Sequence, residues 1–269
     1  MDNHNSTKPL ISIITVCFNS AKTIRQTIES VLNQTYTNIE YILIDGKSTD
    51  NTVAIIQEYA PLFAAKGIAY RWVSEPDNGI YDAMNKGIKL ATGEWIGIIN
   101  SDDYFVSNVV FNDLSQLMST NSFDAFYSDL CYIDSNGNIQ RYWKSGIYNS
   151  KSFNFGWMPP HPTFVVKRSV YEKYGNFRLD LGSSADYELM LRFLLKHGIR
   201  AKWLPKITIY MRIGGISNQS LNNRMKANDN DRKAWLVNQL KPAWYTLYLK
   251  PIRKVSQFFL KPKKIDIET

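Results

Sequence analysis

Hydrophobic and polar positions follow two alternating patterns along the first hundred residues. Four short runs, at 10–16, 39–44, 69–73 and 95–99, are apolar and rich in β-branched residues, as in strands buried on both faces. The segments between them, at 21–33, 52–59 and 80–90, carry apolar residues at helical spacing. Strands that alternate with helices at this spacing predict an α/β fold whose sheet is mostly parallel, with right-handed crossovers.

The pattern changes after residue 100. We predict a helix over 105–118, a strand and hairpin over 124–143 with a turn at Asn136-Gly137, and a loop rich in proline and aromatic residues over 153–162. A strand over 163–166, a helix over 184–197, a strand over 202–211 and a polar helix over 218–240 follow. No internal repeat or low-complexity linker divides the chain. We therefore predict one compact domain over 1–217 and a helical extension over 218–269.

The charge is unevenly distributed. The 269 residues carry 32 Lys and Arg against 24 Asp and Glu, a net charge of +8. Residues 1–223 hold 21 basic and 20 acidic side chains, whereas 224–269 hold 11 and 4. A nucleic-acid-binding module is one reading of a basic chain, but such modules usually carry the basic patch on the folded body. The nearly neutral body predicts no nucleic-acid partner.

Few features mark a compartment. Cys17 and Cys131 are too few for a disulfide framework or a zinc cluster, and we expect Cys17 to lie in a buried strand. Residues 1–9 are polar and lack the apolar core of a signal peptide, and no run of about 18 apolar residues occurs. These observations predict a cytoplasmic location.

Acidic residues follow three consecutive predicted strands. They lie in Asp45-Gly46, in Glu75-Pro76-Asp77, and in Asn100-Ser101-Asp102-Asp103. Because the carboxyl ends of parallel strands share one edge of the sheet, where ligands bind in open α/β folds, these carboxylates should converge. A divalent cation would offset their repulsion, and oxygen ligands suit Mg²⁺ or Mn²⁺, often with phosphate oxygens as further ligands. No P-loop or Gly-x-Gly-x-x-Gly pattern is present.

Several ordered motifs resemble those of family 2 glycosyltransferases. These motifs are ISIITVCFNS…YILIDGKSTDNT (11–52), SEPDNGIYDAMNKGIKLATGEWIGIINSDD (74–103), PPHPTFVVKRSVYEKYGNF (159–177) and SSADYELMLRF (183–193). The resemblance covers roughly residues 10–217 and is strongest to bacterial enzymes that build O-antigen and other surface polysaccharides. It implies the GT-A, or nucleotide-diphospho-sugar transferase, fold: a Rossmann-like, mostly parallel sheet flanked by helices, here with an amphipathic C-terminal tail.

The resemblance also assigns roles to individual residues. It implies that Asp45 accepts a hydrogen bond from the uracil of the donor, that Gly46 lets the backbone pass close to the ligand, and that Asp186 is the catalytic base. Asp102, then Asp103, would ligate the metal. Asp77, Asn85, Asn100 and Arg212 would bind the nucleotide diphosphate, and His161 and Trp157 would contact the acceptor. Two positions depart from the family pattern, because Asn100 and Ala185 stand where acidic residues are expected. Asp50 fits a helix cap better than a ligand.

This set of residues predicts an inverting, metal-dependent transfer of a sugar from a UDP-sugar, with Mg²⁺ or Mn²⁺ as cofactor. The acceptor would be lipid-linked, on undecaprenyl diphosphate, or a saccharide of a growing surface polysaccharide. Two alternatives stay open, namely a donor carrying GDP or dTDP and a non-catalytic nucleotide-sugar-binding protein. The glycines at 214 and 215 suggest a loop that closes over the donor.

The C-terminal extension has an amphipathic pattern. Residues 241–264 include seven Lys and Arg and no acidic residue, and apolar residues recur at helical spacing from Trp244 to Phe259. Pro251 should kink this helix or divide it in two. A basic amphipathic helix is typical of a segment that binds the anionic inner face of the cytoplasmic membrane, and the alternative is a helix that packs on the body.

Overall fold

The computed structural model describes residues 8–120, 122–214 and 221–262. Its strands are β1 (Ile11–Cys17), β2 (Ile39–Asp45), β3 (Ala69–Ser74), β4 (Trp95–Asn100), β5 (Tyr104–Phe105), β6 (Ala125–Ile133), β7 (Ile139–Trp143), β8 (Val165–Lys167) and β9 (Ala201–Arg212). Its α-helices are α1 (Ile24–Leu32), α2 (Thr52–Glu58), α3 (Ala60–Ala65), α4 (Ile80–Leu90), α5 (Val110–Met118), α6 (Arg168–Tyr174), α7 (Ala185–Met190), α8 (Leu221–Val237) and α9 (Thr246–Ser256). Three short 3₁₀ turns are η1 (Ser152–Phe155), η2 (His161–Thr163) and η3 (Gly182–Ser184), and α7 continues as the π-helical turn η4 (Leu191–Lys196).

The nine strands form one mixed sheet in the order β3-β2-β1-β4-β8-β6-β9-β5, with β7 paired to β6. The four strands β3, β2, β1 and β4 are parallel, as the alternating pattern predicted. Beyond β4 the short strand β8 runs antiparallel to both of its neighbours, which restores the original direction in β6 and β9. The sheet is therefore mostly parallel, and most of its expected strands are confirmed to within a residue or two.

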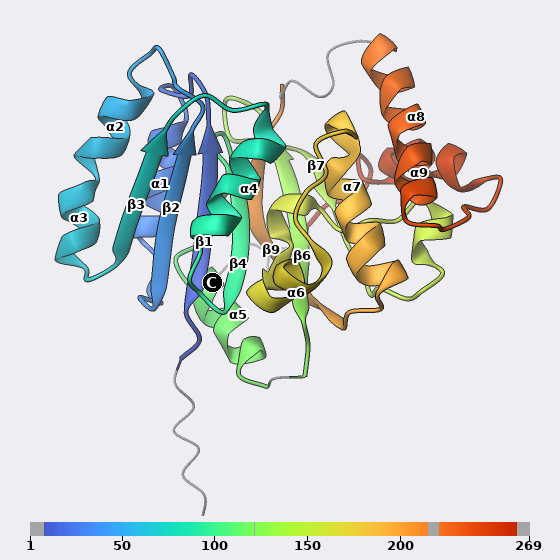
Figure 1. The fold of residues 1–269 in the computed structure, drawn as a ribbon, viewed down its shortest axis with the longest axis horizontal. Helices are drawn as coiled ribbons and strands as arrows, with labels where there is room; N and C mark the ends of the chain where they lie inside the picture. The colour runs from blue at the N-terminus through green and yellow to red at the C-terminus, as the bar shows by residue number, and fades with distance from the viewer. Residues whose placement is uncertain (1–7, 121, 215–220, 263–269) are drawn as a thin grey trace, which may run out of the picture.

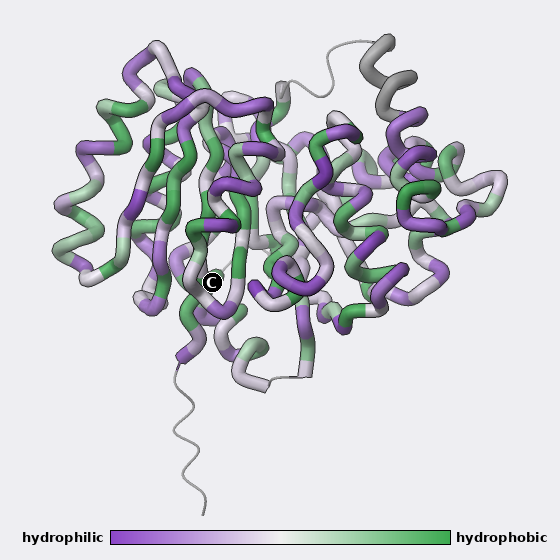
Figure 2. Tube along the Cα trace, in the orientation of Figure 1, coloured by the Kyte–Doolittle hydropathy of each residue, from purple (hydrophilic) through white to green (hydrophobic). Residues whose placement is uncertain are grey.

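Helices cover both faces of the sheet (Figure 1). One hydrophobic core joins alternate residues of β1, β2 and β4 to α4 and α7, and the other joins the intervening residues to α1, α2, α3 and α5. Helix α4 lies very close to β1, because a Cβ on Gly87 would stand only 2.4 Å from Cγ2 of Ile14. The central strands are coloured hydrophobic in Figure 2, whereas most of the described part of α8 is hydrophilic.

The sequence pattern misplaced several short elements. The predicted helix over 105–118 is shorter, because Tyr104 and Phe105 pair with β9 as strand β5 before α5 begins at Val110. Helices α3 and α6 were not predicted. The predicted loop over 153–162 holds most of η1 and the start of η2, and the polar helix expected over 218–240 is α8, whose first three expected residues lie outside the described part.

The C-terminal segment forms one helix, α9, that runs through Pro251. The division into two helices that Pro251 suggested is wrong, because packing on the body holds the helix on both sides of the proline. Thr246 and Leu247 are buried at its first turn, and Gln257 is buried just after its last. The described part of the chain holds no helix with both the length and the hydrophobicity needed to cross a bilayer.

Candidate active site

The carboxyl ends of four strands meet at one edge of the sheet. Asp45 at the end of β2 is in register with Cys17 of β1 and Ser74 of β3, and Asn100 at the end of β4 is in register with Val16. The loops that follow these strands therefore gather the predicted site residues, at the edge where ligands of parallel α/β sheets bind. This confirms that the acidic strand ends share one edge.

Asp45 organises the loop after β2. Its carboxylate is buried and accepts hydrogen bonds from the backbone N–H of Ser48 at 2.9 Å, from the Ser74 hydroxyl at 2.6 Å and from the Ser48 hydroxyl. These bonds satisfy both carboxylate oxygens from within the protein. The uracil contact expected of Asp45 stays a prediction. Asp50 lies one residue before Asn51, the N-cap of α2, and accepts a hydrogen bond from the backbone N–H of Thr52 at 3.0 Å, so it is bonded to the first turn of α2 without being its N-cap.

Gly46, Asp77 and Phe18 border one small space at this edge. A Cβ on Gly46 would stand 2.5 Å from Oδ2 of Asp77 and 3.4 Å from Cδ2 of Phe18, so any other residue here would collide with the aspartate. The other oxygen of Asp77 accepts the backbone N–H of Gly79 at 2.9 Å, which fixes the loop before α4. The Phe18 ring is 61% exposed. Our sequence analysis missed this residue, although an aromatic directly after a buried strand at the ligand edge is a usable signal.

The segment after β4 places its two aspartates differently. Asp103 is completely buried, while Asp102 is partly exposed at the edge. Burial raises the pKa of both carboxyls, and Asp102 raises that of Asp103 further. The Asn100 amide donates to Oδ2 of Asp103 at 3.3 Å, while Oδ1 of Asn100 and Oδ1 of Asp103 are buried without a hydrogen-bond partner among the described residues. The accessible carboxylate of the pair is that of Asp102, and metal ligation by either residue stays a prediction.

Arg212 faces these aspartates from the end of β9. Its guanidinium lowers the pKa of Asp102 and Asp103 against the effect of burial, and it lies 5.6 Å from the centre of the Tyr104 ring. It also donates a hydrogen bond to the Gln26 side chain. The expected position of Arg212 near the diphosphate is compatible with this placement. The glycine loop begins at Gly214, but residues 215–220 lie outside the described part.

Asp186 lies in the first turn of helix α7, which begins at Ala185. Its Oδ1 accepts the backbone N–H of Tyr187 at 2.7 Å, and the side chain is partly exposed. Burial lowers the pKa of His161, and the carboxylate of Asp186 opposes that effect. Burial and the same carboxylate raise the pKa of Tyr81 well above its ordinary value. The rings of Tyr81 and His161 both lie against Phe177, with ring centres 5.5 and 5.4 Å from its own, while the roles of Asp186 as base and of His161 at the acceptor stay predictions.

Tyr132 connects the two groups of carboxylates. Burial raises its pKa, and both Asp103 and Asp186 raise it further. The Arg141 guanidinium lies 3.6 Å from the centre of its ring. The charges of Asp103, after β4, and of Asp186, in α7, thus both act on Tyr132. No sequence signal singled it out, because only the pairing of β6 with β7 and β9 brings it there.

Two predicted contact residues have other roles. Trp157 is buried, donates its indole N–H to the Ser145 carbonyl at 2.7 Å and stacks against Tyr148, so the expected sugar contact would require this packing to open and stays a prediction. The side-chain amide of Asn85 donates a hydrogen bond to the Phe177 carbonyl and accepts one from the Phe177 backbone N–H, both at 2.9 Å. Asn85 thereby links α4 to the loop before α7, and its expected donor contact stays a prediction. That loop supports His161, whose ring stacks edge-on against Phe177.

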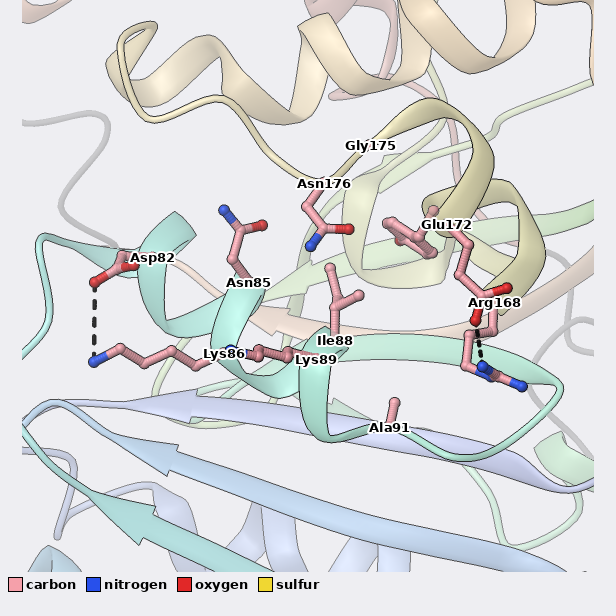
Figure 3. Close-up of a pocket in the computed structure, with 11 residues that line it drawn as sticks. Asp82, Asn85, Lys86, Ile88, Lys89, Ala91, Arg168, Glu172, Gly175 and Asn176 are labelled. Atoms are coloured by element: carbon pink, nitrogen blue, oxygen red, sulfur yellow. Dashed lines mark hydrogen bonds and ion pairs between the residues drawn. The ribbon is translucent and has the colours of Figure 1, made fainter.

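A pocket of about 590 Å³ lies between α4 and α6 (Figure 3). Its rim carries the ion pairs Lys86–Asp82 and Arg168–Glu172. Of the predicted site residues only Asn85 lines it, and Asp45, Asp102 and Asp186 do not. The strand edge, unlike this pocket, gathers predicted site carboxylates beside the exposed Phe18 ring, and it is therefore the basis of the function proposed below.

Comparison with known proteins identifies the family of this chain. A family model described as glycosyl transferase family 2 matches residues 12–176. The chain belongs to glycosyltransferase family 2. This family 2 protein is 32% identical over 203 residues to an uncharacterized glycosyltransferase of Mycobacterium tuberculosis, covering 70% of each chain. It is 26% identical over 211 residues to a PGL/p-HBAD biosynthesis glycosyltransferase of Mycobacterium bovis, covering 78% of this chain and 80% of the relative.

Solved structures establish the GT-A fold of this family 2 glycosyltransferase. S. aureus TarS in complex with UDP-GlcNAc matches with a TM-score of 0.64 and 18% identity, covering 93% of this chain and 72% of that one. A mannosyltransferase from Pyrobaculum calidifontis in complex with GDP-Man and Mn²⁺ matches with a TM-score of 0.62 and 17% identity, covering 94% and 70%. At these identities the likeness concerns the fold and leaves the donor of this chain open.

Proposed function

We propose that this protein transfers a sugar from a UDP-sugar to an acceptor hydroxyl with inversion at the anomeric carbon. The observation that carries the proposal is the gathering of Asp45, Asp77 and Asp102 at the carboxyl ends of β2, β3 and β4, together with an Asp186 carboxylate that acts on Tyr132 as Asp103 does. The nucleotide side of that edge offers the Phe18 ring for stacking on a base, with Gly46 and the free oxygen of Asp77 beside it. Arg212 supplies positive charge for a diphosphate, with which arginine forms bidentate hydrogen bonds.

The residues present fit a Mg²⁺ or Mn²⁺ ion held jointly with the substrate. In the described part of the chain no group of three or more His, Cys, Asp or Glu is placed to hold a metal alone. The accessible Asp102 carboxylate, together with the unpartnered Oδ1 of Asn100, gives oxygen donors, which these ions prefer alongside phosphate oxygens. Asp102 would hold the ion. When bound, the ion would supply Lewis-acid stabilisation of the charge on the leaving diphosphate.

The chain's own residues carry out a single displacement in this proposal. Asp186 removes the proton of the acceptor hydroxyl as its oxygen bonds to the anomeric carbon, and the bond from that carbon to the diphosphate breaks. His161 and Tyr81 border the carboxylate and would orient the acceptor. One displacement without a covalent intermediate inverts the configuration, so an α-linked donor gives a β-linked product.

The acceptor we propose is a saccharide, free or carried on undecaprenyl diphosphate, in the synthesis of a bacterial surface polysaccharide such as an O-antigen. The enzyme would then work at the inner face of the cytoplasmic membrane. The basic extension supports this location, because cationic segments are attracted to the anionic inner leaflet. The glycolipid context printed for the mycobacterial relative, PGL/p-HBAD biosynthesis, is compatible with a lipid-linked acceptor.

A nucleotide panel tests the proposal. UDP at 100 times its dissociation constant should stabilise the fold by about 2.7 kcal/mol. With an unfolding entropy of about 2.1 cal/mol/K per residue, that raises Tm by about 5 °C. A UDP-sugar with a saccharide acceptor should then release UDP and give an inverted product by NMR. A larger Tm shift with GDP or dTDP than with UDP would indicate a donor that carries that nucleotide instead. A Tm shift without sugar transfer would favour a non-catalytic nucleotide-sugar-binding protein. If no nucleotide shifts Tm, the site assignment fails.

A further inference from the structure

Helix α9 and its flanks present a row of exposed apolar side chains. Trp244, Tyr248, Ile252, Val255 and Phe259 are each between 55% and 85% exposed, and we call them the α9 stripe. At about 100° of rotation per residue, Tyr248, Ile252 and Val255 fall within about 60° of one another on the helix. Scattered apolar residues on a surface need no explanation, but a contiguous row of five is typical of a surface that binds something.

The opposite side of α9 is already fastened to the body. Thr246 donates its hydroxyl to the Asn154 carbonyl at 2.9 Å, and the carbonyl of Gln257 accepts the backbone N–H of Tyr142 at 3.0 Å. A Cβ on Gly156 would collide with the backbone of Lys250, so the helix lies directly against η1 there. These contacts fix the helix orientation. Of the two readings of the extension, packing on the body is therefore correct for one side, and the stripe faces outward.

The charges around the stripe select its partner. Arg253 and Lys254 are exposed and lie one on each flank of the helix, roughly 100–160° around it from Tyr248, Ile252 and Val255, and Lys241 and Lys261 extend the charge at its two ends. Lys250 is different, because Asp231 pairs with it at 2.7 Å. No acidic residue occurs in 241–264, whose last two residues lie outside the described part. Pairing with a second copy would bring these cations against each other, whereas an anionic lipid surface would attract them.

We propose that the α9 stripe and its flanking cations form a docking surface for an anionic lipid bilayer. The helix would lie parallel to the bilayer, with Trp244, Tyr248, Ile252, Val255 and Phe259 in the headgroup region and the basic side chains at the phosphates. The proposal deepens the membrane location given under the proposed function. It rests on the proposed function only where it assumes that the acceptor is lipid-linked. The helix that carries the stripe also lies beside the base. Nζ of Lys250 lies 3.5 Å from the ring centre of Tyr187, the residue after Asp186. Docking would therefore hold the start of α7 near the membrane, where a lipid-linked acceptor is found.

Vesicle co-sedimentation of the full chain tests the proposal. Vesicles of phosphatidylcholine containing phosphatidylglycerol should bind the protein, with binding that weakens as salt is added, and vesicles of phosphatidylcholine alone should bind it poorly. Ile252→Glu places a charge in the stripe and should lower binding at least about tenfold. Its matched control is Leu62→Glu, an exposed leucine on α3 at the opposite end of the molecule (Figure 1), which should bind as the wild type does.

A second pair of variants tests the role of charge. Arg253→Gln with Lys254→Gln should weaken binding roughly 30-fold, since each cation contributes about 1 kcal/mol at an anionic surface. The control, Lys89→Gln with Lys173→Gln, removes two exposed positive charges from α4 and α6 and should have little effect. Three results would each overturn the proposal. The first is an equal loss of vesicle binding in the two double variants, and the second is equal binding of the wild type to neutral and anionic vesicles. The third is a dimer in light scattering that Ile252→Glu dissociates. Thermal shift with UDP on the same variants keeps this result separate from the proposed function, because nucleotide binding should survive in all of them.

Discussion

A buried ion pair should hold the helix that carries the proposed base. Glu188 is 1% exposed and Arg192 is 11% exposed, and two hydrogen bonds of 2.9 and 3.0 Å join them. Arg192 also donates to the carbonyls of Gly175 at 2.8 Å and Asn176 at 2.7 Å, which ties α7 to the loop after α6. The Asn238 amide donates to Glu188 at 3.1 Å. Because Asp186 is two residues before Glu188, this network sets its position.

Replacing Arg192 with methionine should destabilise the fold through the charge left behind. Removing one partner of a buried ion pair costs about 3–5 kcal/mol. With an unfolding entropy of about 2.1 cal/mol/K per residue, the change lowers Tm by about 5–9 °C in a chain of 269 residues. Circular dichroism during thermal and urea unfolding measures both quantities, at neutral pH and without nucleotide.

The double variant Glu188→Gln with Arg192→Met separates the charge effect from lost packing. It leaves no orphaned carboxylate, and the introduced glutamine keeps an oxygen that can accept from the Asn238 amide, so at least half of the lost stability should return. The comparison measures the coupling between the two sites, as in a double-mutant cycle. A loss below about 1 kcal/mol in Arg192→Met, or a double variant less stable than the single one, would refute the reasoning.

Three further results follow from the site and the sheet. Phe18→Ala should weaken UDP binding about tenfold in calorimetry, since stacking on a base contributes about 1–3 kcal/mol, while Phe259→Ala, which removes another exposed phenylalanine ring, should not. EDTA should stop sugar transfer, and added Mn²⁺ or Mg²⁺ should restore it in the wild type but not in Asp102→Asn. Full activity of the wild type in metal-free buffer would contradict the metal role of Asp102. Burial of Glu40 opposes its ionisation, but hydrogen bonds from Ser12, Thr92 and Gly93 outweigh it and hold its pKa below the ordinary 4.5. A lowered pKa gives stability that is present above pH 4.5 and is lost as the pH falls through the lower folded value. Glu40→Gln should therefore cost roughly 1–2 kcal/mol at pH 7, and that difference should shrink in acid.

The parallel half of the fold could be predicted from sequence because its signals are local. Strands β1, β2 and β4 are continuous apolar runs, and the bounds of α4 were predicted to the residue from its apolar spacing. Strand β5 could not be predicted from the sequence, because its two residues form a strand only through pairing with β9, about a hundred positions away. Helix α6 is short and buries only Val170 and Tyr171, which leaves too weak a periodic pattern to read.

The site residues also fall into those that the sequence could place and those that it could not. The position of Asp102 at a strand end follows from strand order alone, and Asp186 at a helix start follows from the local pattern. The roles of Trp157 and Asn85 depend on side-chain contacts across the fold, and a sequence motif does not encode whether an indole is buried or an amide is already paired. The family motif identified the segments, while the contacts decided which side chains within them remain available.

The most direct test of the account is sugar transfer by Asp186→Asn, measured beside its affinity for UDP. Asparagine keeps the shape of the side chain and can still accept the N–H of Tyr187, but it cannot take the proton of an acceptor hydroxyl. The account predicts that UDP release in the presence of acceptor falls by about 10²–10⁴-fold, while UDP binds within about twofold of the wild type. Turnover close to that of the wild type in this variant would contradict the assignment of Asp186 as the base.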